Sequence, residues 1–198
     1  GRLQGEKKST IRQLVEKYNL NLRITPNQDI LITDIPNKEK QKIQDVLDTI
    51  GYSKLDEINE IQRHALACPA LPLCGLAMTE AERILPDILE RIEILLNSVG
   101  IQKTILFRMT GCPNGCSRPY MAELALVGSG LNKYQLWLGG SRNLQRLAKP
   151  YLQRMPLEEL ETTLKPLLLE WKALSHQIDF GDFVHLKGEA YVSELLNK

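Results

Sequence analysis

The cysteines constrain this chain more than any other feature of its sequence. The 198 residues hold four cysteines, which stand as two close pairs, Cys68 with Cys74 and Cys112 with Cys116. Four are too few for a disulfide-stapled scaffold of this length. Their clustering in pairs indicates a metal site or redox chemistry.

The second pair lies in the stretch "GCPNGC". If Pro113 takes the first position of a helix, the sulfurs of Cys112 and Cys116 share one face, one turn apart. Gly111 and Gly115 remove side chains where a bulky group has to approach the backbone. The first pair lies in a proline-stiffened loop, which loses little entropy when its cysteines converge on one centre.

Four thiolates bind either zinc or an iron–sulfur cluster, and the spacing of the cysteines helps to distinguish the two. Structural zinc sites favour two to four residues between paired ligands. Here the gaps are five and three residues. A cubane cluster is wider and takes four cysteines. The spacing therefore favours a cluster, with zinc and unligated buried or catalytic cysteines as the alternatives.

Charge and hydropathy exclude two classes of partner. Lys plus Arg total 25 and Asp plus Glu 24, so the bulk basic field typical of nucleic-acid binding is missing. The most apolar stretch, residues 84–99, is interrupted by Glu90, Arg91 and Glu93 and falls short of a membrane span. We therefore expect neither nucleic acid nor a membrane as a partner.

Residues 1–57 are predicted to form a small α/β unit. A helix is expected around Ile11–Tyr18, a hairpin with the turn "TPNQD" around Leu22–Ile32, and a second helix after Pro36 that stops at Gly51.

Residues 58–198 are predicted to form a larger sheet-and-helix domain. After a loop to Met78, Thr79 and Glu82 form a capping box for a helix that ends at Gly100. Strands are expected at 102–109, 121–127 and 133–138, and a long helix at about 156–175. The tail that starts at Phe180 shows a mixed pattern.

The cysteine segments resemble a known family. "ACPALPLCGLAMTEAERILP" followed by "RMTGCPNGCSRPYMAEL" closely resembles the assimilatory sulfite reductase haemoprotein, of the nitrite/sulfite reductase family. "LRITPNQDILITDIP" is similar to the ferredoxin-like half-domain of that family, and "YQLWLGG" and "FGDF" to other landmarks. The resemblance implies an α+β fold: a ferredoxin-like half-domain at 1–57, then a mixed sheet-and-helix domain at 58–198 that binds a 4Fe-4S cluster and siroheme.

The same resemblance implies a function and its ligands. Cys68, Cys74, Cys112 and Cys116 would hold the 4Fe-4S cluster, and Cys116 would also bridge to the siroheme iron. The activity would be the six-electron reduction of sulfite to sulfide. "CSRPY" after the last cysteine looks more like the ferredoxin-dependent members, so ferredoxin is the expected electron donor.

Arginines supply the candidate partners of the siroheme carboxylates, because guanidinium pairs with carboxylate in a bidentate fork. For any one of them, an ordinary surface position is the competing interpretation. Asn114 is expected to shape the turn between Cys112 and Cys116, with a direct cofactor contact as a secondary role. The arginine candidates are Arg63, Arg108, Arg118 and Arg142.

Two other readings remain. Assimilatory nitrite reductases share the cofactors and the cysteine spacing, although "ACPALPLC" favours sulfite. The other is an isolated fragment without cofactor or activity. The resemblance places the chain in the C-terminal half of a longer enzyme, so the N-terminal half of the same polypeptide is an expected partner. The expected location is the cytoplasm, or the plastid stroma in a plant or alga.

Overall fold

The computed structural model describes residues 2–52 and 58–196, and the chain divides into two compact units, Gly1–Asn59 and Glu60–Lys198. Each unit has a hydrophobic core of its own. The predicted domain boundary after residue 57 adjoins the segment 53–57, which lies outside the described residues. No helix among the described residues is both long enough and apolar enough to cross a bilayer.

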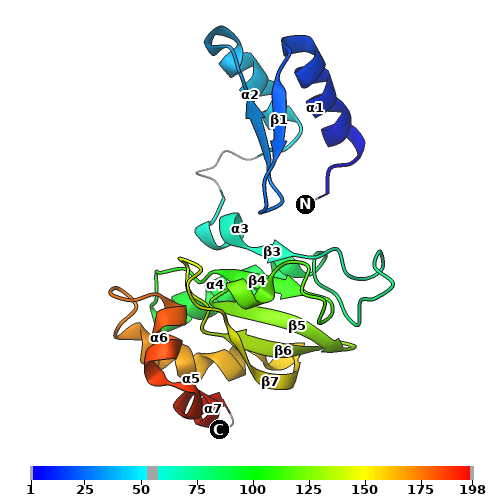
Figure 1. Ribbon diagram of the computed structural model, residues 1–198. Helices are drawn as coiled ribbons and strands as arrows, with labels where there is room; N and C mark the ends of the chain where they lie inside the picture. Colours follow the sequence, from blue (N-terminus) through cyan, green and yellow to red (C-terminus); the bar gives the residue numbers. More distant parts are fainter. Residues whose placement is uncertain (1, 53–57, 197–198) are drawn as a thin grey trace. The chain divides into compact units, whose positions relative to one another are not determined.

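The first unit pairs two helices with a hairpin, as the sequence predicts (Figure 1). Strands β1 and β2 are antiparallel, with Leu22 opposite Ile32. Leu14, Leu20 and Ile43 form its small buried core. The elements are α1 (Gly5–Tyr18), β1 (Asn21–Ile24), β2 (Ile30–Thr33), the 3-10 turn η1 (Asn37–Glu39) and α2 (Lys40–Thr49).

The second unit is a five-stranded mixed sheet in the order β3-β4-β5-β6-β7. Strand β4 runs parallel to both β3 and β5, whereas β6 and β7 continue the sheet antiparallel. The strands are β3 (Leu66–Ala67), β4 (Phe107–Thr110), β5 (Leu124–Gly130), β6 (Lys133–Leu138) and β7 (Lys149–Pro156). The α+β class expected from the sequence is therefore confirmed.

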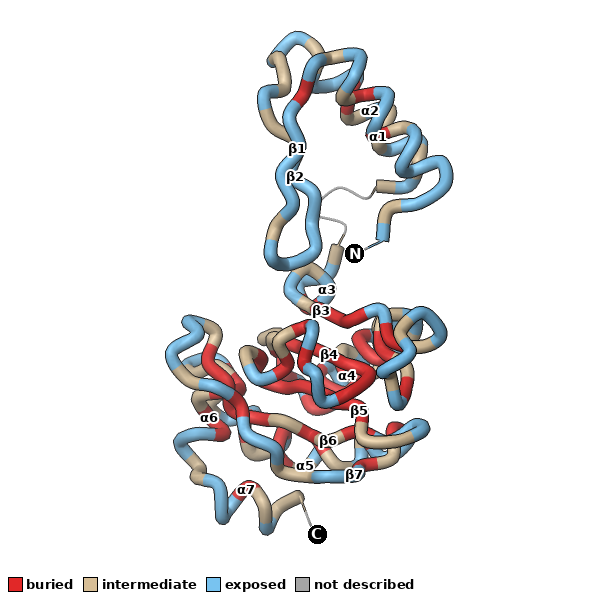
Figure 2. The backbone as a smooth tube through the Cα atoms, turned by 45° about the vertical axis from the view of Figure 1, so that its right-hand side comes forward, coloured by how far each residue is buried: buried red, intermediate tan, exposed pale blue. Residues whose placement is uncertain are grey.

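Helices cover one face of this sheet and form the main core with it (Figure 1). Phe107, Leu124 and Leu136 point into that core, and strands β4 and β5 are largely buried (Figure 2). The apolar stripes of α4 and α5 pack there as their helical spacing predicts. The helical elements of this unit are α3 (Glu60–His64), α4 (Leu85–Val99), η3 (Pro119–Met121), η4 (Leu157–Glu159), α5 (Leu160–Lys172), α6 (Phe180–Lys187) and α7 (Glu189–Leu196).

The predicted capping box at Thr79 is wrong. Helix α4 begins at Leu85, with no side-chain cap. The Thr79 hydroxyl instead pairs with the hydroxyl of Tyr134 (3.0 Å) and accepts the amide of Asn132 (3.2 Å). The hydroxyl oxygen of Thr79, which the capping box would have used, is therefore engaged in tertiary hydrogen bonds.

One predicted strand needs correction, and the sequence did not predict another. The strand expected at 102–109 is formed only from Phe107, because side chains take the polar groups before it: Glu123 accepts the amide of Leu106, and Arg142 donates to the carbonyl of Thr104. Strand β7 was not predicted at all. Its prolines argue against a strand, but β7 lies at the edge of the sheet, where proline is tolerated.

Candidate functional site

Both cysteine segments leave the sheet at the carboxyl ends of neighbouring parallel strands. In the parallel pair β3–β4, Ala67 lies opposite Met109. Cys68 directly follows β3, and Cys112 comes two residues after β4 ends at Thr110. Parallel strands place their carboxyl ends at one edge, where α/β sheets commonly hold ligands.

Hydrogen bonds join the two segments directly. The amide of Cys68 donates to the carbonyl of Met109 (3.2 Å), and the amide of Gly111 donates to the Sγ of Cys68 (3.2 Å). The Gly111 carbonyl accepts the amides of Met78 (2.8 Å) and Thr79 (3.3 Å). The two cysteine pairs therefore belong to one connected piece of backbone.

The loop that carries Cys74 is closed by its own backbone. The amide of Cys74 donates to the carbonyl of Ala70 (2.8 Å), and the amide of Glu82 donates back to the carbonyl of Cys68 (3.1 Å). Cys68 is buried, and Cys74 is partly exposed.

The condition that Pro113 starts a helix is not met. Residues 111–118 form successive turns, with Gly115 at φ +68° and Arg118 at φ +54°. Such left-handed conformations cannot continue an α-helix. Cys112 is buried and Cys116 is exposed, and no helical face joins their sulfurs.

Three consecutive residues of β4 hold this turn in place. Arg108 donates from Nη1 to the carbonyl of Arg118 (3.1 Å), and the hydroxyl of Thr110 donates to the carbonyl of Cys112 (3.1 Å). Between them, the carbonyl of Met109 accepts the hydroxyl of Ser117 (2.7 Å). The turn is thus fastened on both sides of Cys116 even though Cys116 itself is exposed.

The thiols interact electrostatically. Burial raises the pKa of the Cys68 thiol, the amides of Gly111 and Ala70 partly offset that rise, and the nearby Cys116 and Cys112 add to it. Cys112 and Cys116 thus contribute to the electrostatic environment of the Cys68 thiol.

The donor set has the chemistry of a thiolate-ligated metal site. All four cysteines are free, and an amide already donates to one of the sulfurs. Within residues 2–52 and 58–196, no three His, Cys, Asp or Glu side chains are placed as a ready metal-binding group. The backbone therefore brings the two segments together, and the thiols would have to turn to meet at one centre.

Arg108 is a buried cation close to another cation. The residue is 5% exposed, and its Nε lacks a hydrogen-bond partner among the described residues. Burial, and to a lesser extent the nearby charge of Arg118, lowers the pKa of Arg108 to about 10. Two adjacent guanidinium groups, one of them incompletely satisfied, favour an anion nearby.

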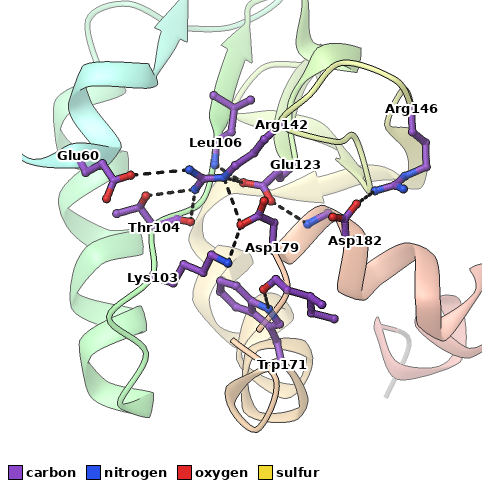
Figure 3. Close-up of polar contacts among 12 residues, drawn as sticks. Glu60, Lys103, Thr104, Leu106, Glu123, Arg142, Arg146, Trp171, Asp179 and Asp182 are labelled. Carbon is purple, nitrogen blue, oxygen red and sulfur yellow. Dashed lines mark hydrogen bonds and ion pairs between the residues drawn. The ribbon is translucent and has the colours of Figure 1, made fainter. Parts of the chain in front are cut away.

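Arg142 belongs to a separate network around Glu123, which no sequence motif predicted (Figure 3). The Glu123 carboxylate is fully buried and accepts the amides of Leu106 (2.8 Å) and Gly181 (3.0 Å) and the Nε of Arg142 (3.0 Å). Burial raises the pKa of Glu123 against the effect of these donors. A lone carboxylate inside the apolar run "AELALV" was the signal that could have revealed it.

Arg142 has further partners in that network. It donates to the carbonyl of Thr104 and lies 3.7 Å from Glu60 and 3.8 Å from Asp179. These contacts give Arg142 a structural role, and a cofactor contact stays a prediction. Of the other predicted residues, Arg63 lies partly exposed in α3 and Asn114 is exposed in the turn between Cys112 and Cys116.

Comparison with known proteins decides the family. Residues 1–50 match the model of the nitrite/sulfite reductase ferredoxin-like half domain. The chain is 48% identical over 179 residues to the sulfite reductase (ferredoxin) of Synechococcus elongatus, a match that covers 89% of this chain. The chain belongs to the nitrite/sulfite reductase family.

Other relatives extend this likeness to both units. The sulfite reductase (NADPH) hemoprotein beta-component of Oceanobacillus iheyensis is 39% identical over 188 residues, which covers 93% of this chain. The NirA protein of Mycobacterium tuberculosis shares the fold, with a TM-score of 0.73 at 21% identity over 93% of this chain and 36% of its own. The chain spans 28% and 32% of the lengths of the first two nitrite/sulfite reductase relatives.

Proposed function

We propose that this chain is the cofactor-bearing part of a ferredoxin-dependent sulfite reductase. The observation that carries the proposal is the hydrogen-bonded pairing of the Cys68 and Cys112 segments at one edge of the sheet. The identity to a relative named sulfite reductase (ferredoxin) supports both sulfite as the substrate and ferredoxin as the electron donor. Residues 1–57 would form the half-domain and residues 58–198 the domain that holds the cofactors.

The four cysteines would hold a 4Fe-4S cluster, with Cys116 shared with siroheme. When bound, the two cofactors supply the electron-transfer chemistry by which sulfite takes up six electrons and six protons and leaves as sulfide and three waters. Cys116 is suited to the shared role because it is the exposed cysteine. Cys68 and Cys112 are buried and would keep solvent from the cluster.

The chain also offers positive charge at this site. The guanidinium groups of Arg108 and Arg118 would face anionic carboxylates of the siroheme, and the unpartnered Nε of Arg108 supports that role. Arg63, Arg142 and Asn114 are weaker candidates for the same task. Free cysteines fit a reducing compartment, which supports the cytoplasm or a plastid stroma as the location.

The full-length polypeptide tests the proposal. We expect it to show siroheme absorbance and to reduce sulfite with reduced ferredoxin at a much higher kcat/KM than nitrite. A preference for nitrite would favour the nitrite reductase alternative. A colourless protein without iron would instead indicate a module without cofactor. In that case the N-terminal half of the polypeptide would not complete a siroheme site with this chain.

A further inference from the structure

The hairpin of β5 and β6 packs tightly against one of the cysteine segments. A Cβ placed on Gly128 of β5 would lie 2.5 Å from the carbonyl carbon of Gly111, closer still to its oxygen, and 2.8 Å from Cγ2 of Thr79. Such approaches are too close for any side chain. The backbones of Gly128 and Gly111 are therefore in direct contact.

The same hairpin also holds the other segment. The hydroxyl of Tyr134, which is fully buried in β6, donates to the carbonyl of Glu80 (2.9 Å) and shares a hydrogen bond with the hydroxyl of Thr79 (3.0 Å). The amide of Thr79 in turn donates to the carbonyl of Gly111 (3.3 Å). Tyr134 thus fixes residues 79 and 80, and these residues support Gly111.

Gly111 has little freedom between these neighbours. A Cβ on Gly111 would lie 2.6 Å from the Cβ of Ala70 and 2.7 Å from the carbonyl oxygen of Thr79. The carbonyl of Gly111 contacts Gly128 and accepts the amides of Met78 and Thr79. On its other side, the amide of Gly111 points at the Sγ of Cys68. The direction of this amide is set by the hairpin.

We propose that Gly128 and Tyr134 are positioning residues that hold the Gly111 amide against the Cys68 sulfur. The inference rests on the proposed function, because it takes Cys68 to be a ligand of the iron–sulfur cluster. Hydrogen bonds to ligand sulfur help to set the reduction potential of such a cluster. Removing such a hydrogen bond should make the reduced, more negatively charged form of the cluster less stable. The reduction potential should then move to more negative values.

The test compares two alanine substitutions on one strand in the full-length polypeptide. Gly128→Ala forces the Gly111 peptide to move. Gly130→Ala is the matched control, because its Cβ would meet only the end of the Arg154 side chain at 3.5 Å and Cβ of Lys133 at 4.0 Å. We expect Gly128→Ala alone to shift the midpoint potential to more negative values and to alter the electron paramagnetic resonance spectrum. Iron release to a chelator should become about tenfold faster, the scale seen when a hydrogen bond to a metal ligand is lost.

Tyr134→Phe provides a second variant that adds no atom, in case Gly128→Ala fails to fold. It removes the hydroxyl that holds Thr79 and Glu80, so the potential should shift in the same direction. The inference is wrong if Gly128→Ala behaves like Gly130→Ala, or if Tyr134→Phe leaves both the potential and the iron release unchanged.

Hydrogen exchange at the Gly111 amide in the metal-free polypeptide separates this inference from the proposed function. The amide should be protected in the wild type and in Gly130→Ala, and should exchange faster in Gly128→Ala and Tyr134→Phe. If the wild type takes up no iron, the proposed function fails while the exchange still measures the geometry. Equal exchange in all four proteins would overturn the positioning role even if the cluster assembles.

Discussion

The amide of Gly111 donates a hydrogen bond to the sulfur of Cys68, although 43 residues separate them along the chain. The bond joins the segment of one cysteine pair to a sulfur of the other. We therefore expect the two pairs to act as a single site, in which damage to either pair affects the whole.

Anaerobic reconstitution with iron and sulfide tests this unity. We expect about four irons and four sulfides per chain, as for a cysteine-ligated cubane. Cys68→Ala and Cys112→Ala, one from each pair, should each abolish most of this uptake, because both remove a ligand of the same centre. Retention of half of the iron in either variant would indicate two separate sites, and uptake of one zinc with no iron would contradict the cluster.

The bridging role of Cys116 is tested by comparing two serine variants of the full-length polypeptide. Serine oxygen is a harder ligand than thiolate, so Cys116→Ser should weaken both the cluster and its link to siroheme. We expect an altered siroheme absorption and spin state, and sulfite turnover lower by orders of magnitude, in preparations that keep a cluster. Cys68→Ser should damage the cluster first. An unchanged siroheme spectrum and normal turnover in Cys116→Ser would assign the bridge elsewhere.

Glu123→Gln should destabilise the second unit. The two carboxylate oxygens of Glu123 accept hydrogen bonds from three donors. A glutamine side chain has only one oxygen that can accept, because its other terminal atom is an NH₂ donor. We expect the free energy of unfolding to fall by about 2 kcal/mol, the scale for leaving a buried donor unsatisfied. Denaturant unfolding measures it, and Glu189→Gln, in an exposed pair with Lys149, should cause no measurable change.

Gly181→Ala should also be destabilising, for a steric reason. A Cβ at Gly181 would overlap the carbonyl oxygen of Gly140 and lie 3.2 Å from the Glu123 side chain. Overpacking of this kind typically costs about 1–3 kcal/mol. Gly75→Ala is the control, because nothing lies within 4 Å of its Cβ position. Equal melting temperatures for the two variants would show that the backbone at Gly181 yields easily.

Tyr134 predicts a specific loss of stability at alkaline pH. Burial raises its pKa to about 12 in the folded chain, whereas an unfolded tyrosine ionises near pH 10. The folded state therefore holds the proton longer, and the contribution of Tyr134, complete below pH 10, is lost as the pH rises to about 12. Over that range the stability of the wild type should fall more steeply than that of Tyr134→Phe, by up to about 1.4 kcal/mol per pH unit. Parallel curves from denaturant titrations would contradict this assignment.

Local patterns predicted most of the helices and strands. The apolar spacing of α1, α4 and α5 and the alternation of Tyr134, Leu136 and Leu138 in β6 are confirmed, because each depends on which face is buried. The errors at Thr79 and around Leu106 have one cause. Partners distant in the sequence, Tyr134 and Glu123, take polar groups that a local pattern assigns to a cap or a strand.

The candidate site was predictable in its residue types and not in its geometry. Cysteine spacing and the surrounding motifs led to Cys68, Cys74, Cys112 and Cys116, whose ligand roles stay predictions. Spacing could not show that residues 111–118 turn instead of forming a helix, since that depends on the left-handed conformations of Gly115 and Arg118. Nor could it show the contact between Gly128 and Gly111, which exists only once the strands have paired.

The parallel pairing of β3 with β4 determines the order in which the two cysteine segments can come together during synthesis. Parallel neighbours cannot be joined by a tight turn, and here helix α4 forms the connection between them. During synthesis, the segment of Cys68 and Cys74 emerges long before β4, and it lacks the Gly111 amide and the Met109 carbonyl until β4 has followed. A nascent chain that stops short of β4 offers a metal only two unsupported thiols. Loading of the proposed centre would therefore be a late event, because it would require β4 to pair with β3 first.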